Sequence, residues 1–407
     1  MKKTTVIYLV SVCWLVLVGV LSFFTLKREK QRNPFPIEYD YRMKGMDSLR
    51  LSVPVPDGVY EVQILLGHRK KAGMTTVRAE SRRLFLENEY TAEGEYKGYR
   101  FCIHKRTPQI NEQERVRLKK REYNKLNWNH TLDLEFAGAN PQVARVIIRP
   151  AKNDVPVLFL CGNSTVVDQD NEPWGSWGQM IPRFFNHQLC VANFAESGES
   201  ANTFIAAKRW KKILTMIKPG DYVLIEFGHN DQKQKGEGKG AYLSFWNSMK
   251  QMVDEARAAG ATPILVTPTQ RRSFGPDGKI QDTHLDFPQA TRDLAAQESV
   301  ALIDLHAMTR TLYESFGEEA SKCLFVHYPA GTWPGQTKDL ADNTHFNPFG
   351  AYQVAKCVVE GLRQANVDLV QYLRDDVTTY HPAHPDDPSQ FIWSPSEYIE
   401  IEKPDGN

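Results

Sequence analysis

The chain shows two different hydrophobic patterns, one on each side of residue 150. From Ile37 to about Pro150, short stretches of alternating apolar and polar residues are separated by Gly, Pro and Asn, as in LRLSVPV and GVYEVQILL. This spacing predicts an all-β sandwich. After residue 150, fully apolar runs alternate with segments whose apolar residues have helical spacing. The apolar runs are 157–161, 190–194, 222–227, 263–267 and 300–305. Strands that are apolar on both faces and separated by helices predict a doubly wound parallel sheet in a three-layer α/β fold.

The helical periods place amphipathic helices between these runs. Phe204, Ala207, Trp210, Leu214 and Ile217 form one apolar stripe, and Pro219 and Gly220 end it. Similar patterns predict helices over residues 241–259, 288–297 and 348–373. The last stretch, from about His381, is rich in Pro and Asp and is predicted to be irregular surface chain.

The N-terminus carries an uncharged run from Thr5 to Leu26, with basic residues on both sides. Its length suits a signal peptide or an uncleaved membrane anchor. The basic flank after the run favours an orientation in which the C-terminal bulk of the chain stays inside the cell. We nevertheless expect export to the periplasm or the extracellular space, with membrane contact only through this segment. The expected organisation is therefore an N-terminal segment (1–32), a β-sandwich with a galactose-binding-like layout (35–150), an α/β domain (155–375) and an irregular tail (376–407).

Charge and cysteine content exclude several classes of protein. The 407 residues include 50 Lys and Arg against 49 Asp and Glu, so no basic excess indicates nucleic-acid binding. The six cysteines form no CxxC pair or repeating spacing, which argues against a zinc ribbon or a dense disulfide framework. We expect buried free thiols and no metal site.

Polar residues follow the first three apolar runs at the point where each strand is expected to end. Ser164 follows the first run within GNST, Gly198 the second within NFAESGES, and Asn230 the third within GHND. Ligands of open α/β sheets bind outside the carboxyl ends of the strands. Taken alone, each residue is explained equally well or better by a turn or a helix cap. Gly-x-Ser-x-Gly is absent, so the usual α/β-hydrolase elbow does not apply.

A fourth polar block lies near the C-terminus. Asp342 precedes His345 by three residues in DNTHF, in an expected irregular loop before a helix that begins at Pro348 with Asn347 as its cap. A carboxylate bound to one imidazole nitrogen fixes the tautomer and supports the cation that forms when the other nitrogen takes a serine proton. A lone loop histidine is more often structural, but the four blocks in this order predict one catalytic crevice.

These blocks resemble the SGNH or GDSL hydrolase superfamily over about residues 157–373. The longer stretches GNSTVVDQDNEPWGSWGQMIPRFF and DNTHFNPFGAYQVA are similar to rhamnogalacturonan acetylesterases, and TTVRAESRRLFLEN is similar to the added β-domain of bacterial members. The resemblance implies Ser164 as nucleophile, His345 as base and Asp342 as its orienting partner. It implies oxyanion donors at Ser164, Gly198 and Asn230. The family's usual Asp of the first block is Asn163 here, which leaves open how the loop is held.

The resemblance implies removal of acetyl groups from rhamnogalacturonan, an acidic pectic polysaccharide, through an acetyl-enzyme and without a cofactor. Trp174 and Trp177 are candidates for stacking on sugar rings, with buried packing as the alternative. Arg271 and Arg272 follow the fourth strand and are candidates for meeting an acidic polymer, with solvated charge as the alternative. The basic run from Arg115 to Lys125 is expected to be a solvated loop.

Three other functions fit parts of the sequence. The first is an esterase of the same architecture that acts on acetyl-xylan, a lipid or a thioester. The second is a non-catalytic glycan-binding protein. The sequence argues against it, because every expected catalytic position holds a residue type that can do the chemistry. The third is a glycosidase, which needs two facing carboxylates. No spacing singles out a pair among Asp170, Glu172, Glu199 and Glu226.

Overall fold

The computed structural model of the protein describes residues 38–42 and 50–405. The predicted signal peptide or anchor lies outside the described residues. Within the described ranges, none of the helices has the length and hydrophobicity that a membrane span needs. The five cysteines in these ranges are free thiols, as expected.

Five parallel strands form the centre of the α/β part. Their order across the sheet is β10, β9, β11, β12, β13, so the chain starts in the middle and winds outward in both directions. The predicted doubly wound sheet is therefore confirmed, with the flavodoxin-like order in which ligands bind where the winding reverses. The bounds are β9 Val157–Cys161, β10 Cys190–Asn193, β11 Tyr222–Glu226, β12 Thr262–Val266 and β13 Ala301–Ile303.

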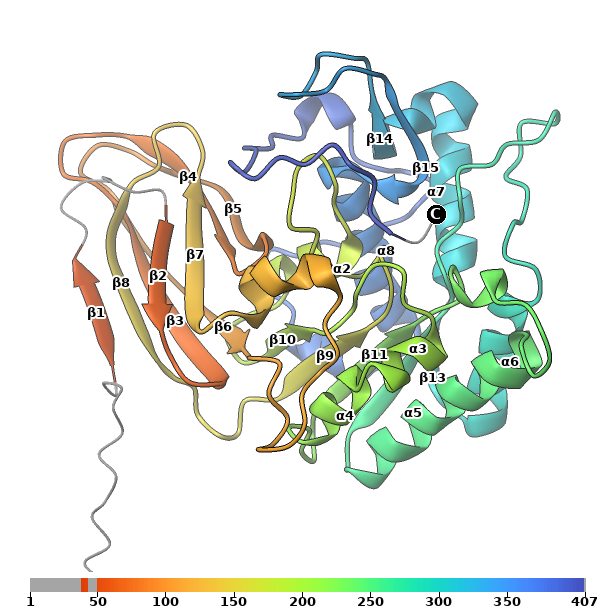
Figure 1. Ribbon diagram of the computed structural model, residues 1–407. Coiled ribbons are helices and arrows are strands. Elements are labelled where there is room, and N and C mark those ends of the chain that lie inside the picture. The colour runs from red at the N-terminus through yellow and green to blue at the C-terminus, as the bar shows by residue number, and fades with distance from the viewer. Residues whose placement is uncertain (1–37, 43–49, 406–407) are drawn as a thin grey trace, which may run out of the picture. The chain divides into compact units, whose positions relative to one another are not determined.

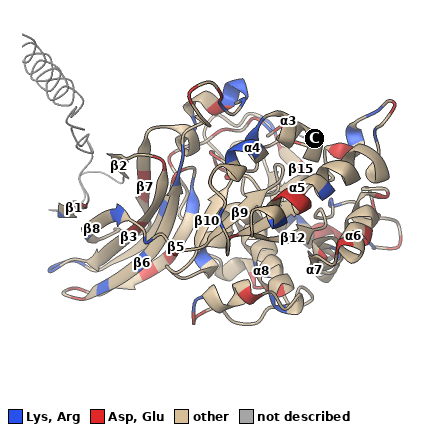
Figure 2. Ribbon diagram, turned by 90° about the horizontal axis from the view of Figure 1, so that it is seen from below, with Lys and Arg blue, Asp and Glu red and all other residues tan. Residues whose placement is uncertain are grey.

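Helices cover both faces of this sheet, as Figure 2 shows. Leu158 and Leu160 of β9 face a core shared with α2, α7 and α8, whereas Phe159 and Cys161 face a second core shared with α3 to α6. This alternation explains why the strands are apolar at every position. The bounds are α2 Trp177–Met180, α3 Ala201–Ala206, α4 Arg209–Leu214, α5 Trp246–Ala258, α6 Phe287–Glu298, α7 Leu305–Ala320 and α8 Pro348–Gln364.

The N-terminal strands form two antiparallel layers around a third core (Figure 1). One layer has the order β2, β7, β4, β5, and the other has β1, β8, β3, β6. Alternate residues of β3, such as Val62 and Ile64, are buried between them. The bounds are β1 Tyr39–Arg42, β2 Arg50–Pro54, β3 Gly58–Gly67, β4 Gly73–Ala79, β5 Arg83–Thr91, β6 Tyr96–Lys105, β7 Thr131–Ala137 and β8 Val143–Pro150.

The antiparallel layer that contains β6 is continuous with the parallel sheet. Strand β6 pairs in parallel with β10, with Cys102 opposite Cys190 and Ile103 opposite Val191, so nine strands form one hydrogen-bonded sheet. The sequence pattern changes near residue 150, but the backbone hydrogen bonding does not stop there. The exact domain boundaries stay a prediction.

Two of the predicted helices are shorter than the apolar pattern suggests, because the backbone turns within them. The first ends where Lys208 adopts a left-handed conformation (φ 62°), which separates α3 from α4. This break lets Arg209 of α4 reach the buried carboxylate of Glu122, 2.5 Å away. The predicted helix over residues 348–373 ends at Gln364, and Asn366 turns the chain with a φ of 50°.

Several elements were not predicted from the pattern. They include the helices α2 and α7 and the antiparallel pair of β14 (Phe325–Tyr328) and β15 (Leu340–Phe346). The expectation that Asp342 and His345 lie in an irregular loop is wrong, because both residues belong to β15. The polar sequence DNTHF hides this strand, since only part of it packs into the core.

Two buried ion pairs connect the β-sandwich to the segment that carries Ser164. Arg82 and Arg83, at the start of β5, bind Glu172 and Asp168 in the segment between β9 and α2. The Arg82 Nη2–Glu172 Oε1 distance is 2.6 Å and the Arg83 Nε–Asp168 Oδ2 distance is 2.9 Å, and all four side chains are at most 1% exposed. Removing one partner from such a pair leaves an uncompensated charge in the interior.

We therefore predict that Arg83→Met lowers the free energy of unfolding by about 3 to 5 kcal/mol, the usual cost of breaking a buried pair. Urea unfolding followed by tryptophan fluorescence measures this change. Arg145→Met is the matched control, because its partner Asp40 forms an exposed pair with side chains 40% and 36% accessible. That change is expected to cost at most about 1 kcal/mol. Equal effects of the two substitutions would contradict the prediction.

Candidate active site

Ser164 lies in a tight turn directly after β9. The turn needs a glycine at position 162, because a Cβ atom there would stand 2.5 Å from Val166 Cγ2 and 3.0 Å from the Glu226 carbonyl oxygen. The Ser164 side chain is 2% exposed, and its carbonyl oxygen accepts a hydrogen bond of 2.9 Å from Gln169 Nε2. The serine is thus held at the carboxyl end of the central strand, where the winding of the sheet reverses.

Strand β15 brings His345 and Asp342 to this serine. The distance from His345 Nε2 to Ser164 Oγ is 2.9 Å, and the distance from His345 Nδ1 to Asp342 Oδ2 is 2.7 Å. Asp342 Oδ1 also accepts the backbone N–H groups of Thr344 and His345, at 2.8 and 3.0 Å. The three residues that the sequence suggested as a triad are therefore joined by hydrogen bonds in the expected order.

The local hydrogen bonds determine the charge of Asp342. Burial of the carboxyl group favours its protonation, but the hydrogen bonds from His345 and from two backbone N–H groups more than offset this effect and lower the pKa of Asp342 to about 2. The carboxylate is consequently ionised at neutral pH. It orients the imidazole through Nδ1 and leaves Nε2 facing the serine hydroxyl.

Asn163 keeps the bracing role of the aspartate that the family pattern would place there. Its Oδ1 accepts hydrogen bonds from the backbone N and the Oγ1 of Thr165, both at 3.0 Å. The loop that carries Ser164 is therefore braced by a neutral amide. The open question of how the loop is held is answered by the side-chain oxygen, which an asparagine and an aspartate both possess.

Glu226, at the end of β11, is a buried acid next to this loop that the sequence analysis did not assign to the site. Thr165 Oγ1 lies 2.8 Å from its Oε1, and Trp177 Nε1 donates to its Oε2 at 2.6 Å. Burial raises the pKa of Glu226 to about 7. Thr165 Oγ1 connects the side chains of Asn163 and Glu226, since it lies within hydrogen-bond distance of both Asn163 Oδ1 and Glu226 Oε1. The one signal in the sequence was an acid inside the apolar run YVLIEF.

The two other blocks supply candidate oxyanion donors. Gly198 has a φ of 76°, and a Cβ atom there would stand 3.1 Å from Lys119 Nζ. The amide of Asn230 donates one N–H to the Glu199 carbonyl oxygen at 2.9 Å, which fixes its plane. Among the hydrogen bonds of the described residues, none uses the backbone N–H of Ser164 or Gly198.

The polar neighbours of these donors serve as braces. Asp231 accepts the backbone N–H groups of Ala201 and Gly228, both at 2.9 Å, and so ties the third block to α3. The basic run in the β-sandwich is not the solvated loop that was expected. Lys119 Nζ lies 3.1 Å from Glu199 Oε1 and Arg121 Nη2 lies 2.7 Å from Glu196 Oε1, so this run packs against the second block.

The predicted sugar-binding residues lie in different environments. Trp174 packs edge-on against His345, with ring centroids 5.8 Å apart, but it is 3% exposed and donates to the Glu400 carbonyl oxygen. Stacking on Trp177 is contradicted, because this residue has no exposed surface and its indole N–H binds Glu226.

The two arginines after β12 also differ. The guanidinium of Arg272 is occupied by hydrogen bonds within the protein, to Ser321, Asn343 and the Glu318 carbonyl oxygen. A role of Arg272 in meeting substrate is therefore contradicted in this structure. Arg271 is partly exposed and binds Thr283 Oγ1 at 3.0 Å and the His229 carbonyl oxygen at 3.3 Å, which places it beside the third block.

The carboxylates considered for a glycosidase are engaged in other contacts. Glu172 pairs with Arg82, Asp170 with Lys125 at 2.6 Å, and Glu199 with Lys119. Glu226 binds Thr165 and Trp177 beneath the serine loop. No two of them face each other across the triad in these contacts, so the structure favours an esterase.

The C-terminal chain runs beside the triad. Glu400 N donates to the Glu172 carbonyl oxygen at 3.0 Å, and Glu172 N donates to the Tyr398 carbonyl oxygen at 2.8 Å. Further along, Lys403 Nζ lies 3.5 Å from Asp342 Oδ2, and Arg121 forms an ion pair with Asp405. The tail is irregular, as expected, but it is anchored against the segment that carries Ser164.

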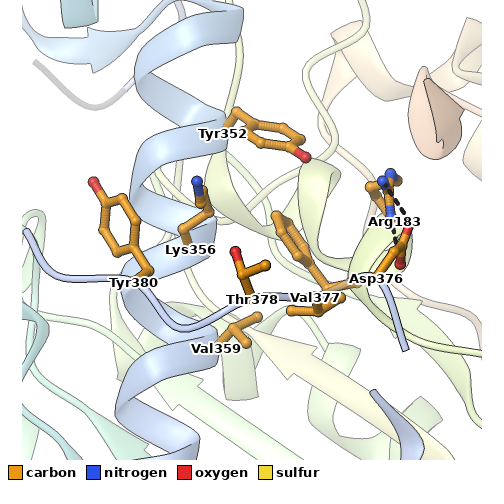
Figure 3. A pocket seen from close by; sticks show the side chains of 9 residues that line it. Arg183, Tyr352, Lys356, Val359, Asp376, Val377, Thr378 and Tyr380 are labelled. Carbon is orange, nitrogen blue, oxygen red and sulfur yellow. Dashed lines mark hydrogen bonds and ion pairs between the residues drawn. The ribbon is translucent and has the colours of Figure 1, made fainter. Parts of the chain in front are cut away.

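A separate small pocket lies between α8 and the chain that follows it, as Figure 3 shows. Arg183, Tyr352, Lys356, Asp376 and Tyr380 contribute to its walls, and its volume is 80 Å³. Ordinary ligand sites enclose about 300 Å³ or more. Because it contains no residue of the triad and is too small for a sugar residue, this pocket is not the candidate site.

Comparison with known proteins agrees with this geometry. The GDSL-like Lipase/Acylhydrolase family matches residues 160–352. Rhamnogalacturonan acetylesterase RhgT of Bacillus subtilis (strain 168) is 40% identical over 218 residues, which cover 53% of this chain and 93% of the relative. The probable rhamnogalacturonan acetylesterase YesY of the same strain is 31% identical over 217 residues, covering 53% and 95%. The chain belongs to the GDSL/SGNH lipase and acylhydrolase family, whose members are carboxylic ester hydrolases.

A third relative extends the similarity toward the N-terminus. The uncharacterized esterase YxiM of Bacillus subtilis (strain 168) is 25% identical over 321 residues, covering 78% of this chain and 74% of the relative. This alignment is longer than the whole part of the chain that follows residue 156, so it includes part of the β-sandwich. The predicted family, fold and ester hydrolase class are confirmed.

The protonation of Glu226 generates a prediction about pH and stability. A buried acid whose pKa is raised from 4.5 to about 7 stabilises the fold below its ordinary pKa, and this contribution is lost as the pH rises through 7. Glu226→Gln imitates the protonated acid. We expect the variant to match the wild type at pH 5 and to be more stable at pH 8.5, by up to roughly 3 kcal/mol.

Thermal and urea unfolding at the two pH values measure this difference. Glu255→Gln is the matched control, because Glu255 also accepts an indole N–H, from Trp210, but is only half-buried. The difference in unfolding free energy between the Glu255→Gln variant and the wild type should change little between pH 5 and pH 8.5. A Glu226→Gln variant with the same pH dependence as the wild type would show that Glu226 does not titrate in this range.

Proposed function

We propose that this chain is a serine esterase that removes acetyl groups from rhamnogalacturonan, with Ser164 as nucleophile, His345 as general base and Asp342 as the residue that orients the base. The observation that carries the proposal is the continuous hydrogen-bonded path from Asp342 through His345 to Ser164, with steps of 2.7 and 2.9 Å. A serine hydroxyl is a weak nucleophile at neutral pH, so a base within hydrogen-bond distance is what activates it.

In the first half of the reaction, Ser164 Oγ attacks the acetyl carbonyl carbon while His345 Nε2 takes the serine proton. The tetrahedral intermediate collapses when His345 returns this proton to the sugar oxygen, which leaves as the free hydroxyl, and an acetyl-enzyme remains. In the second half, His345 takes a proton from water as the water oxygen attacks the acetyl carbon. The bond between this carbon and Ser164 Oγ then breaks, His345 returns the proton to Oγ, and the acid product leaves and ionises to acetate. The ionised Asp342 stabilises the imidazolium in both halves.

The developing negative charge needs donors that are already in position. We assign this role to the backbone N–H groups of Ser164 and Gly198 and to the second N–H of the Asn230 side chain. The hydrogen bond from Asn230 to the Glu199 carbonyl oxygen supports the assignment, because it fixes the amide plane before substrate arrives. A neutral amide needs no protonation step and donates at any pH at which the fold is stable.

The choice of substrate is supported by two observations. Relatives at 40% and 31% identity carry the name rhamnogalacturonan acetylesterase. In addition, three cations lie close together beside the triad. Loss of water around its ammonium group, together with the charges of Arg271 and Lys403, lowers the pKa of Lys233 to about 8. An anionic polymer such as one containing galacturonate relieves this repulsion, whereas a neutral xylan or a lipid ester does not.

We also propose that the protein acts outside the cytoplasm. The uncharged run from Thr5 to Leu26 with flanking basic residues supports export, because such a segment is read by the secretion machinery. Extracellular or periplasmic placement suits an enzyme whose polymeric substrate does not enter the cell. Fractionation of cells that produce the full chain tests this, and recovery only in the cytosol would contradict it.

The assigned roles predict the kinetic effects of substitutions. Ser164→Ala should lower kcat by at least about a thousandfold, since it removes the nucleophile. Asn230→Ala should lower kcat about 100- to 1000-fold, the usual cost of one oxyanion donor. Release of acetate from acetylated rhamnogalacturonan oligosaccharides provides the assay, and circular dichroism verifies folding.

Asn202→Ala is the matched control for Asn230→Ala, because the side-chain oxygen of Asn202 accepts hydrogen bonds from Ser200 and Gln234 and Asn202 has no assigned role in the reaction. It should retain kcat within a fewfold. Near-normal activity of folded Ser164→Ala protein would remove the proposed mechanism, and labelling of the wild type but not this variant by a fluorophosphonate would support it.

The cationic cluster predicts how substrate affinity depends on charge. Lys233→Met should raise KM for acidic acetylated rhamnogalacturonan severalfold without a similar change for p-nitrophenyl acetate, which is neutral. In the wild type, KM for the acidic substrate should rise between pH 7 and pH 9, as Lys233 loses its proton.

Lys235→Met is the matched control, because Lys235 is also exposed and lies two residues from Lys233, the lysine whose charge is influenced by Arg271 and Lys403. It should leave both KM values unchanged. Equal catalytic efficiency on acetyl-xylan and acetylated rhamnogalacturonan would assign the enzyme to the broader class of carbohydrate esterases. Preference for long-chain esters would contradict the substrate proposal while leaving the serine mechanism intact.

A further inference from the structure

A cluster of metal-ligating side chains lies behind the third block of the crevice, and the mechanism does not use it. Asp282 and His284 belong to the segment between β12 and α6, and His306 lies in the first turn of α7. One ligand atom from each of the three residues lies within 4.8 Å of the other two. The two histidines are buried, whereas the Asp282 side chain is 41% exposed, so the cluster opens to solvent through its carboxylate.

The surroundings of His306 fix its tautomer. Its Nδ1 lies 3.0 Å from the Pro268 carbonyl oxygen, which can only accept, so Nδ1 carries the proton and donates it. Its Nε2 lies 2.7 Å from Gln270 Nε2, which donates to its lone pair, and 3.1 Å from Asp282 Oδ2. A metal ion bound to Nε2 takes the place of the Gln270 N–H and also gives the facing carboxylate a positive partner. An imidazole that donates Nδ1–H to a backbone carbonyl is the usual arrangement of a metal-ligating histidine.

His284 is the second residue that favours a metal ion. Its side chain has no exposed surface, and neither ring nitrogen has a hydrogen-bond partner among the described residues. Its Nδ1 lies 4.0 Å from Asp282 Oδ1. Buried imidazole nitrogens are normally paired, and an unpaired one asks for an explanation. The Gln270 N–H binds only His306 and leaves His284 unpaired, whereas a metal ion gives the His284 lone pair a partner.

The spacing of the three ligand atoms suits a small ion. Zn²⁺ binds imidazole nitrogen and carboxylate oxygen at about 2.0 to 2.2 Å, so two ligands in a tetrahedral site are about 3.3 to 3.6 Å apart. The distance from Asp282 Oδ2 to His306 Nε2 is 3.1 Å and the distance from Asp282 Oδ1 to His284 Nδ1 is 4.0 Å, so the two carboxylate oxygens face one imidazole each at separations on either side of this range. Two imidazoles and one carboxylate form a borderline-soft ligand set, which suits zinc and its neighbours and not the oxygen-preferring Mg²⁺ or Ca²⁺.

We propose that Asp282, His284 and His306 form a binding site for a divalent transition-metal ion of the zinc class. The ion connects the segment between β12 and α6 to the start of α7. The His284 ring packs edge-on against His229 at a centroid distance of 4.5 Å, and Arg271 binds the His229 carbonyl oxygen, so the same segment supports the residue before Asn230. The site is structural. It does not contact the triad, and its existence is independent of the proposed reaction.

The experiment uses the full chain without a histidine tag, freed of metal by a chelator and titrated with Zn²⁺ in a calorimeter. We expect one Zn²⁺ per chain and a higher Tm in its presence, because an ion that binds the folded state stabilises it. Asp282→Asn and His284→Gln should weaken binding at least about tenfold and abolish the Tm shift. Because the Asp282 side chain is partly exposed, the Asp282→Asn variant should fold even if the buried substitution His284→Gln prevents folding.

The matched control is the double variant His381→Gln and His384→Gln, which removes a surface histidine pair with ring centroids 5.6 Å apart. It should bind Zn²⁺ like the wild type. Co²⁺ in place of Zn²⁺ reports imidazole coordination through its visible absorption, which should disappear in the Asp282→Asn variant. Absence of one tight site in the wild type, undiminished binding by both site variants, or loss of binding in the surface control would each overturn the proposal.

Discussion

The position of Ser164 depends on charges buried between the β-sandwich and the α/β part. Arg82, in the turn before β5, and Arg83, the first residue of β5, bind Glu172 and Asp168, which lie in the same segment as Ser164. Asp168 also accepts hydrogen bonds from Asn193 of β10 and from Asn127. The arginines thus hold a segment that has little regular structure of its own. Buried ion pairs add little net stability over apolar packing, but they allow few alternative arrangements of the groups that they connect.

Inside the site, three acids have different protonation states because their surroundings differ. Asp342 accepts donors on both oxygens and stays ionised. Burial favours the neutral form of Glu226, although Thr165, Trp177 and the backbone of Thr269 hydrogen-bond to it. Burial also raises the pKa of Asp231 to about 7, although it accepts two backbone N–H groups. The ionised Asp342 places a negative charge next to the imidazole, whereas Glu226 and Asp231 act mainly as hydrogen-bonding braces.

The fold and the triad were largely readable from the sequence, for physical reasons. Strands buried on both faces must be apolar throughout, so β9 to β13 were visible as runs. Residues that follow such strands must meet at one edge, so Ser164 and Asn230 were predicted together. What remained hidden depends on tertiary contacts. The break at Lys208 serves an ion pair with Glu122, the strand that holds Asp342 and His345 is polar, and the burial of Trp177 depends on Glu226, which is far away in the sequence.

The pairing of β6 with β10 has a consequence for how this enzyme can be divided. Strand β10 would be the outermost strand of the parallel sheet if β6 did not cover its backbone. A fragment that starts after residue 150 would expose a row of unpaired peptide groups, the feature by which sheets of separate molecules stick together. The same fragment would leave Asp168 and Glu172 without their counterions. The β-sandwich therefore covers the edge of the parallel sheet and supplies the counterions of two buried acids in the α/β part.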